Sequence, residues 1–186
     1  DEFGVKYSAD RKRLLEAPND LTNYIIRKGT VVICDDSFYC CYNLVSIVIP
    51  NSVKIICDFA FGHCSSLASV NLPDTVTNIN EYAFSDCDSL NSAFLPPLIS
   101  ILREGVFCGC SGLISIVIPE TVKIIEDKTF SGCNGLSSIV IPSSVSSIGN
   151  YSLQGCSGLA SIIVEKGNSF YDSRNYCNAI IETKSN

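Results

Sequence analysis

The 186-residue sequence has few charged residues, one histidine and no methionine. Its 13 Lys and Arg against 19 Asp and Glu give a net charge of −6, which does not favour nucleic acid or another polyanion as a partner. The basic clusters Arg11 to Arg13 and Arg27 with Lys28 are interpreted as solvated turns. No apolar run is long enough to span a bilayer, so we expect no membrane insertion. With His63 alone and no C-x-x-C pair, the usual zinc spacings are missing, and we expect neither a metal nor a cofactor.

What the sequence does have is a strict period of 23 residues. A fixed period between 20 and 30 residues is typical of a solenoid, in which one supersecondary unit stacks on copies of itself. Such a stack presents a long surface more often than it encloses a reaction, so the period favours binding over catalysis. The positions that keep the period are Cys41, Cys64, Cys87, Cys110, Cys133 and Cys156, together with Pro50, Pro73, Pro96, Pro119 and Pro142.

Each unit contains one row that is expected to form a strand. The row from Leu44 to Pro50 follows an L-x-x-L-x-L pattern, whose last three positions alternate as in a strand with one buried face. The Pro lacks an N–H donor, so the ladder should stop there. The pattern predicts a β-rich solenoid with few or no long helices and a parallel strand face of about seven rows, roughly 30 Å long. The rows open on Leu21, Leu44, Leu67, Leu90, Leu113, Leu136 and Leu159.

Two further apolar positions in each unit are expected to complete the core. A second apolar pair follows each Pro, as in Val53 with Ile56, and should face the core from the opposite wall. A large apolar residue then recurs at a fixed position of each unit. It is Phe in five units and Leu153 in the last, so only an apolar residue of similar bulk is required there. The aromatic residues at this phase are Phe38, Phe61, Phe84, Phe107 and Phe130.

The two ends of the sequence break the period. Residues 5–17 and 170–183 both place a Tyr ahead of a polar turn and a paired apolar dipeptide followed by Glu, which suggests two copies of one hairpin. We therefore divide the chain into an N-terminal hairpin insertion or cap (1–20), a repeat array (21–164) and a C-terminal hairpin insertion or cap (165–186). No repeat follows the second hairpin and no methionine precedes Asp1. We expect either a longer array continuing past residue 186 or a final cap, with any secretion signal outside this sequence.

The repeat unit, C-x-x-L-x-S-I-x-I-P from Cys110 to Pro119 and I-x-x-x-x-F-x-G-C from Ile125 to Cys133, resembles the BspA-like leucine-rich repeats over residues 18–164. The flanking hairpins also resemble those that interrupt repeat arrays in surface proteins of gut and oral Bacteroidetes. The resemblance implies a right-handed leucine-rich solenoid in a secreted or surface-attached protein. It also implies that adhesion to host extracellular proteins, which some members perform, is a candidate function. The family has no catalytic motif to carry over.

The eleven cysteines fall into two groups. The six periodic ones should be buried thiols that act as small hydrophobes, because parallel stacking spaces their Cβ atoms by about 4.8 Å and a disulfide usually needs about 3.5 to 4.5 Å. A strained bridge between Cys34 and Cys57 is left open. The redox compartment and the redox state of the remaining five are also left open. These five are Cys34, Cys40, Cys57, Cys108 and Cys177.

Alternation places two columns of side chains on the outward side of the strand rows. An apolar stripe on an exposed sheet is a candidate contact surface, although β-branched residues also stabilise parallel rows without any ligand. Phe94 stands out as an outward aromatic in the one unit with Pro96-Pro97, which makes it the candidate anchor. The candidate partner-binding face comprises Val48, Asn71, Phe94, Val117, Val140 and Ile163 with Ser69, Ser92 and Ser115. Its two full columns are Ile25, Val48, Asn71, Phe94, Val117, Val140 and Ile163, and Asn23, Ser46, Ser69, Ser92, Ser115, Ser138 and Ser161.

These observations favour a non-enzymatic, secreted or cell-surface bacterial module that binds a protein through its strand face, with host extracellular-matrix proteins as candidate partners. His63 is interpreted as a solvated turn residue, since its row offers no carboxylate or nucleophile for a catalytic constellation. One alternative is a structural spacer that presents another domain. A second is a carbohydrate-binding solenoid, for which aromatic platforms are expected and Phe94 alone is thin support.

Overall fold

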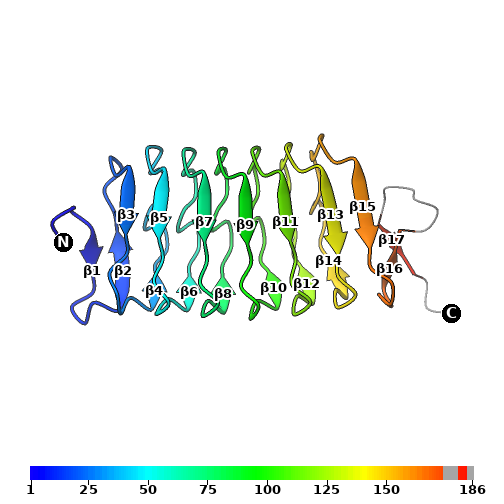
Figure 1. Cartoon of the computed structure of the whole chain (residues 1–186), viewed down its shortest axis with the longest axis horizontal. Coiled ribbons are helices and arrows are strands. Elements are labelled where there is room, and N and C mark those ends of the chain that lie inside the picture. The colour runs from blue at the N-terminus through cyan, green and yellow to red at the C-terminus, as the bar shows by residue number, and fades with distance from the viewer. Residues whose placement is uncertain (174–179, 184–186) are drawn as a thin grey trace.

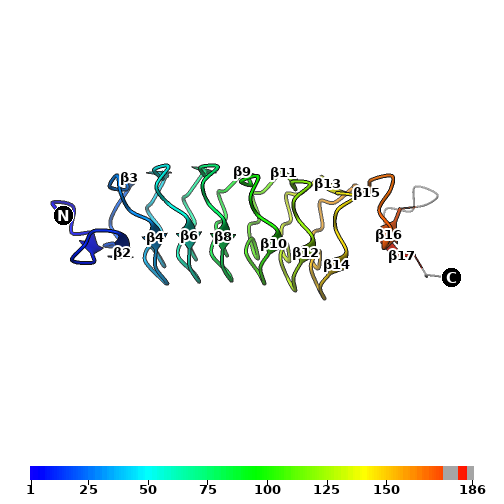
Figure 2. The same cartoon turned by 90° about the horizontal axis from the view of Figure 1, so that it is seen from below.

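The computed structural model describes residues 1–173 and 180–183. It is an elongated solenoid with its strands stacked along one long axis and its two ends far apart (Figure 1). Seen from below, the strands form two walls, and the upper wall runs nearly straight (Figure 2). The described residues form strands and turns with no helix. This arrangement confirms the β-rich leucine-rich-repeat solenoid with a parallel face of about seven rows.

The first wall contains one strand from each coil. Every strand pairs in parallel with the strand one period away, so that Val70 lies beside Ala93 and Asn71 beside Phe94. The strands form one sheet in the order β11-β9-β7-β5-β3 and a second of β13 and β15, which continues the row (Figure 1). Their bounds are β3 Asn23–Ile25, β5 Ser46–Val48, β7 Ser69–Asn71, β9 Ser92–Phe94, β11 Ser115–Val117, β13 Ser138–Ile141 and β15 Ser161–Val164.

The second wall is built from two-residue strands, each of which ends on the second member of the apolar pair of its unit, while the first member lies in the turn before the strand. Val53 and Ile56 are both fully buried, as expected for residues that face the core from this side. The strands are β4 Val32–Ile33, β6 Ile55–Ile56, β8 Asn78–Ile79, β10 Ile101–Leu102, β12 Ile124–Ile125 and β14 Ser147–Ile148.

Each end of the chain carries an antiparallel strand pair. At the N-terminus β1 (Lys6–Tyr7) pairs with β2 (Arg13–Glu16), and β2 then pairs in parallel with β4. The first row of the second wall therefore comes from the hairpin itself. At the other end β16 (Tyr171–Asp172) pairs with β17 (Ile181–Glu182). The division into caps and array stays a prediction.

The core between the walls contains a continuous column of phenylalanine rings. The rings of Phe38, Phe61, Phe84, Phe107 and Phe130 are fully buried and stacked, with centroids of successive rings 5.0 to 6.0 Å apart. Tyr24 continues the aromatic packing in the first coil, where its ring is tilted against Phe38 and its hydroxyl lies 2.8 Å from that of Tyr7. Leu153, at the phenylalanine phase of the last coil, is only half-buried.

The periodic cysteines form a second column inside the solenoid. Five of the six are fully buried, but Cys156 in the last coil is half-buried because the core thins there. Their interpretation as plain small hydrophobes is incomplete. The thiol of Cys87 donates to the carbonyl oxygen of Phe61 at 3.2 Å, and Cys64, Cys110, Cys133 and Cys156 repeat this bond at 3.0 to 3.2 Å with the Phe 26 residues earlier.

Candidate protein-binding face

We define the strand face as the outward side chains of the seven strands β3, β5, β7, β9, β11, β13 and β15. In each strand the middle residue is directed into the core and its two neighbours are directed outward, because successive side chains alternate across a strand. Ile47, for example, is buried while Ser46 and Val48 on either side of it are exposed. The strand register then stacks equivalent residues of successive coils into two straight columns.

The apolar column of the strand face is strongly exposed. The exposed fractions are 73% for Ile25, 67% for Phe94 and 70% for Val117, which is unusual for large apolar side chains in a protein whose core is otherwise well filled. Val48, Val140 and Ile163 are also exposed, and Asn71 interrupts the stripe between Val48 and Phe94.

The hydroxyl column runs parallel to the apolar one. Ser46 donates to the side-chain oxygen of Asn23 at 2.6 Å, and Ser92 donates to that of Asn91 at 3.0 Å. Ser92 is half-buried, whereas Ser69 and Ser115 are exposed. All nine residues predicted for the face thus lie together on it. Whether they bind a partner stays a prediction.

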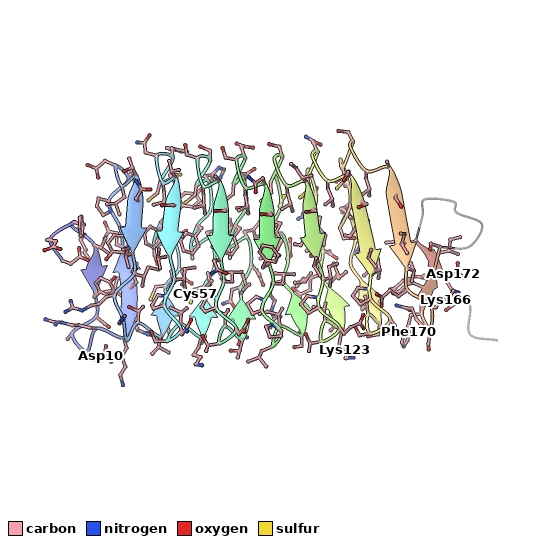
Figure 3. The ribbon with its side chains drawn as sticks, viewed as in Figure 1. Asp10, Cys57, Lys123, Lys166, Phe170 and Asp172 are labelled. Atoms are coloured by element: carbon pink, nitrogen blue, oxygen red, sulfur yellow. The ribbon has the colours of Figure 1, made fainter. Side chains whose placement is uncertain are left out.

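The strand face also lacks charge, a feature that the reasoning from sequence did not use. None of the 13 basic and 19 acidic residues falls within residues 21–26, 43–50, 66–73, 89–96, 112–119, 135–142 or 158–164, which contain the seven strands. Charged side chains such as Asp10 and Lys123 lie along the lower edge of the view in Figure 3, away from the upper strands. The signal was present in the sequence as a charge-free window of six to eight residues in each unit.

A shallow hollow of about 500 Å³ lies at the N-terminal end of the strand face. Ile25 and Val48 of the apolar column line it together with Pro50 and Gly29 from the adjoining turns. It offers room for an apolar side chain of a partner next to the two exposed aliphatic residues.

The opposite turns carry a different cluster. Tyr39 makes edge-on ring contacts with Phe59 and His63, and Phe59 stacks on Tyr82 with centroids 5.0 Å apart. His63 lies in a turn with its side chain 40% exposed, as expected, but 3.6 Å from the side chain of Asp86, a neighbour that was not predicted from the sequence. Asp86 lies one period further on, and stacking of the coils brings it to His63.

A short polar network continues from that cluster along the turns. Tyr82 donates to Glu104 at 2.6 Å, and Lys128 donates to Glu104 at 3.0 Å. The hydrogen bond from Tyr82, followed by the one from Lys128, lowers the pKa of Glu104 below its ordinary value. The same carboxylate raises the pKa of Lys128 to about 12. The network joins three consecutive coils, so its role is structural.

The off-column cysteines give no sign of a shared ligand. Cys34, Cys40, Cys57 and Cys108 are free, half-buried thiols, and Cys177 lies outside the described residues. Burial raises the pKa of Cys57 to about 11, which makes its thiolate scarce at neutral pH. Within residues 1–173 and 180–183, no group of three His, Cys, Asp or Glu side chains is placed to hold a metal ion. The same part of the chain has no helix long and apolar enough to cross a membrane.

The family model for the BspA type leucine rich repeat region matches residues 31–160 in six copies. The chain belongs to this family. The resemblance noted over residues 18–164 is thereby confirmed for residues 31–160, and leucine-rich repeats of this kind are generally non-enzymatic and mediate protein interactions. No curated protein matches the chain.

Solved structures of bacterial leucine-rich repeat proteins share the fold. The T. pallidum leucine rich repeat protein is 28% identical with a TM-score of 0.79, covering 88% of this chain and 80% of its own. A leucine-rich repeat protein from Eubacterium ventriosum is 24% identical with a TM-score of 0.81, covering 88% of this chain but 45% of its own. A leucine rich cell surface protein from Faecalibacterium prausnitzii is 24% identical with a TM-score of 0.53, covering 89% and 64%. The latter two show the fold alone.

Proposed function

We propose that this chain is a non-enzymatic module that binds a protein through its strand face, as part of a bacterial protein exposed on the cell surface or secreted. The observation that carries the proposal is the exposed apolar column on a face without charged residues. A charge-depleted apolar patch is the composition of an interface core, and it costs little to dehydrate. The surface setting is supported by the F. prausnitzii neighbour, which is described as a cell surface protein.

Phe94 is the expected anchor of the interface. It stands in the middle strand of the seven with its ring two-thirds exposed, and covering a side chain of this size contributes about 1.5 to 3 kcal/mol. Aromatic side chains at the centre of an interface supply a large share of binding energy, because the surrounding contacts exclude water from them. Val117 and Val140 would supply such surrounding contacts on one side of Phe94.

The proposal is tested by screening the protein against purified extracellular-matrix and serum proteins by surface plasmon resonance. We expect saturable binding to at least one of them, weakened by Val117→Ala or Val140→Ala and lost in Phe94→Glu. Thermal unfolding of each variant checks that the fold is kept. Binding that all three variants preserve would contradict a role for the strand face. Absence of binding to the whole panel would favour a structural spacer instead.

A further inference from the structure

We propose that the strand face binds a second copy of this chain, face to face about a two-fold axis that runs parallel to the strands and lies between the two faces, over β9. This inference rests on the proposed function in that both assign contact to the strand face, and it names the partner. Three features bear on it: the residue order along the face, the charge of the molecule and the size of the patch.

The apolar column is nearly symmetric about its middle row. Phe94 lies in β9, the fourth of seven strands. Two rows away on either side are Val48 and Val140, and three rows away are Ile25 and Ile163. In a two-fold interface, residues at equal distances on opposite sides of the axis contact each other, so that residue i meets j and j meets i. About this axis Val48 would oppose the valine at 140 in the second copy, and Ile25 would oppose the isoleucine at 163. Only the pair of Asn71 and Val117 joins a polar with an apolar residue.

The hydroxyl column obeys the same symmetry. A rotation about an axis parallel to the strands reverses the order of the rows but leaves each column facing its own copy. Ser92 of one molecule then faces Ser92 of the other, and Ser69 faces Ser115. Serine hydroxyls both donate and accept, so water molecules held between the identical columns can bridge them. A rotation about the solenoid axis would instead place hydroxyls against apolar side chains, and it is disfavoured for that reason.

The charge distribution favours approach of two copies through this face. Each copy has a net charge of −6, so two copies repel each other through most of their surfaces. The strand face has no charged residue, and its nearly straight course allows a second sheet to lie along its length (Figure 2). Sheets packed in this way lie about 10 Å apart. Added salt should therefore strengthen the association, because it screens the remaining repulsion.

The size of the patch predicts a weak dimer. Seven rows span roughly 30 Å, and about five residues of each row span roughly 15 Å, which gives on the order of 500 Å² per molecule. A standard stable interface buries about 800 Å² per partner. We therefore expect a dissociation constant in the micromolar range or weaker. The exposed Ile163 of one copy would enter the hollow beside Ile25 and Val48 of the other.

Sedimentation equilibrium of the protein between about 1 μM and 1 mM tests the dimer, the range following from the expected weak affinity. We expect a monomer–dimer equilibrium that 0.5 M NaCl does not weaken. Phe94→Glu should raise the dissociation constant roughly 30-fold or more, because it places two carboxylates at the centre of the contact. The matched control is Leu98→Glu, which changes an apolar residue of the same coil that is 56% exposed but lies outside the strand face. It should leave the constant unchanged.

Charge-swapped variants test the two-fold geometry. Val48→Glu combined with Val140→Lys should restore association, whereas Val48→Glu with Val140→Glu should abolish it, since only the first pair opposes unlike charges across the axis. Likewise, Phe94→Glu and Phe94→Lys should associate with each other when mixed, but neither should associate alone. If the wild type dimerises while neither swap restores association, the two-fold arrangement is wrong.

The outcomes separate this inference from the proposed function. A wild-type protein that stays monomeric at 1 mM overturns the second copy as partner, while the screen against matrix proteins still tests the proposed function on its own. A dimer that survives Phe94→Glu also overturns the inference, because its interface would lie elsewhere. A dimer with the predicted swap behaviour supports the inference. The screen against matrix proteins is then run at protein concentrations below the dissociation constant of the dimer, where the strand face is free.

Discussion

At the scale of single residues, the buried thiols link one coil to the next. Each ladder cysteine from Cys64 to Cys156 donates to a phenylalanine carbonyl 26 residues earlier, so the column joins successive coils by side chains as well as by the sheets. Burial is the main cause that raises the pKa of Cys41, to about 11, and it raises the pKa values of Cys64, Cys110 and Cys133 further. The thiols of Cys64, Cys110 and Cys133 are therefore neutral donors over the physiological pH range.

These raised pKa values predict a loss of stability in alkali. In the unfolded chain the thiols ionise near their ordinary value of 9.0, whereas in the fold they stay protonated to higher pH. The stabilising contribution is thus complete below pH 9 and is lost as the pH rises above it. We expect urea unfolding with reductant present to show a free energy that falls by about 1.4 kcal/mol per pH unit for each of Cys64, Cys110 and Cys133. A free energy that is constant between pH 8 and 10.5 would contradict this account.

A second prediction concerns Gly105, because the ring of Tyr82 occupies the space that a side chain at residue 105 would need. A Cβ at Gly105 would lie 2.2 Å from Cε1 of Tyr82, and the backbone there is left-handed with φ of +59°. Gly105→Ala should cost about 2 to 4 kcal/mol, from the left-handed backbone and the displaced ring together. The control is Gly155→Ala, where φ is +74° and the nearest atom, Cα of Gly132, lies at an ordinary contact distance of 3.6 Å. It should cost only about 1 kcal/mol in the same urea titration. Equal costs at the two sites would show that the contact with Tyr82 is unimportant.

At the scale of elements, the strands are short and their stability comes from the column of rings between the walls. Phe84 stacks between Phe61 and Phe107, with centroid distances of 5.2 and 5.9 Å. Phe84→Ala should cost about 3 to 5 kcal/mol in urea unfolding because it opens a cavity in the middle of the array. Phe84→Leu should cost clearly less, since the last coil already carries Leu153 at this phase. If Phe84→Leu were as costly as Phe84→Ala, the stacking of rings rather than filled volume would control this position.

Much of this architecture could be predicted from the sequence because the period fixes the register. Once residue n lies beside residue n+23, the positions of Leu44, Phe61 and Cys87 in the core follow without further information. Contacts outside the repeat could not be predicted in this way. The pairing of β2 with β4 joins Leu14 to Ile33, 19 residues apart, and the contact between Tyr7 and Tyr24 is specific to the first coil.

The residues of the candidate face were predicted from the sequence, whereas its lack of charge was visible in the sequence but was not used. Alternation placed Phe94 and Val117 outward, and the structure confirms their exposure. The partner of His63 was missed because Asp86 lies in the next coil, and reasoning along one row does not consider it. The half-buried state of Cys156 was missed because a strict period treats the last coil like the others, although no further coil covers it within the described residues.

At the scale of the whole molecule, the solenoid separates two kinds of surface. The turns carry the charged and aromatic side chains, including the network of Tyr82, Glu104 and Lys128, which joins neighbouring coils. The strand face carries hydroxyl and apolar columns without charge. A partner of low net charge that binds the face should therefore show an affinity that is nearly independent of ionic strength, and one that binds the turns should not, whereas a second copy of this chain should bind more tightly in salt. Titrations at 50 mM and 500 mM NaCl distinguish the two.

The most direct measurement compares the wild type, Phe94→Glu and Leu98→Glu in one titration against whichever partner the wild type binds. The two variants add the same charge to the same coil, one on the strand face and one outside it. If the strand face is the contact surface, Phe94→Glu abolishes binding, Leu98→Glu binds like the wild type, and all three proteins unfold at the same temperature. Equal binding by the two variants would contradict the assignment of function to the strand face.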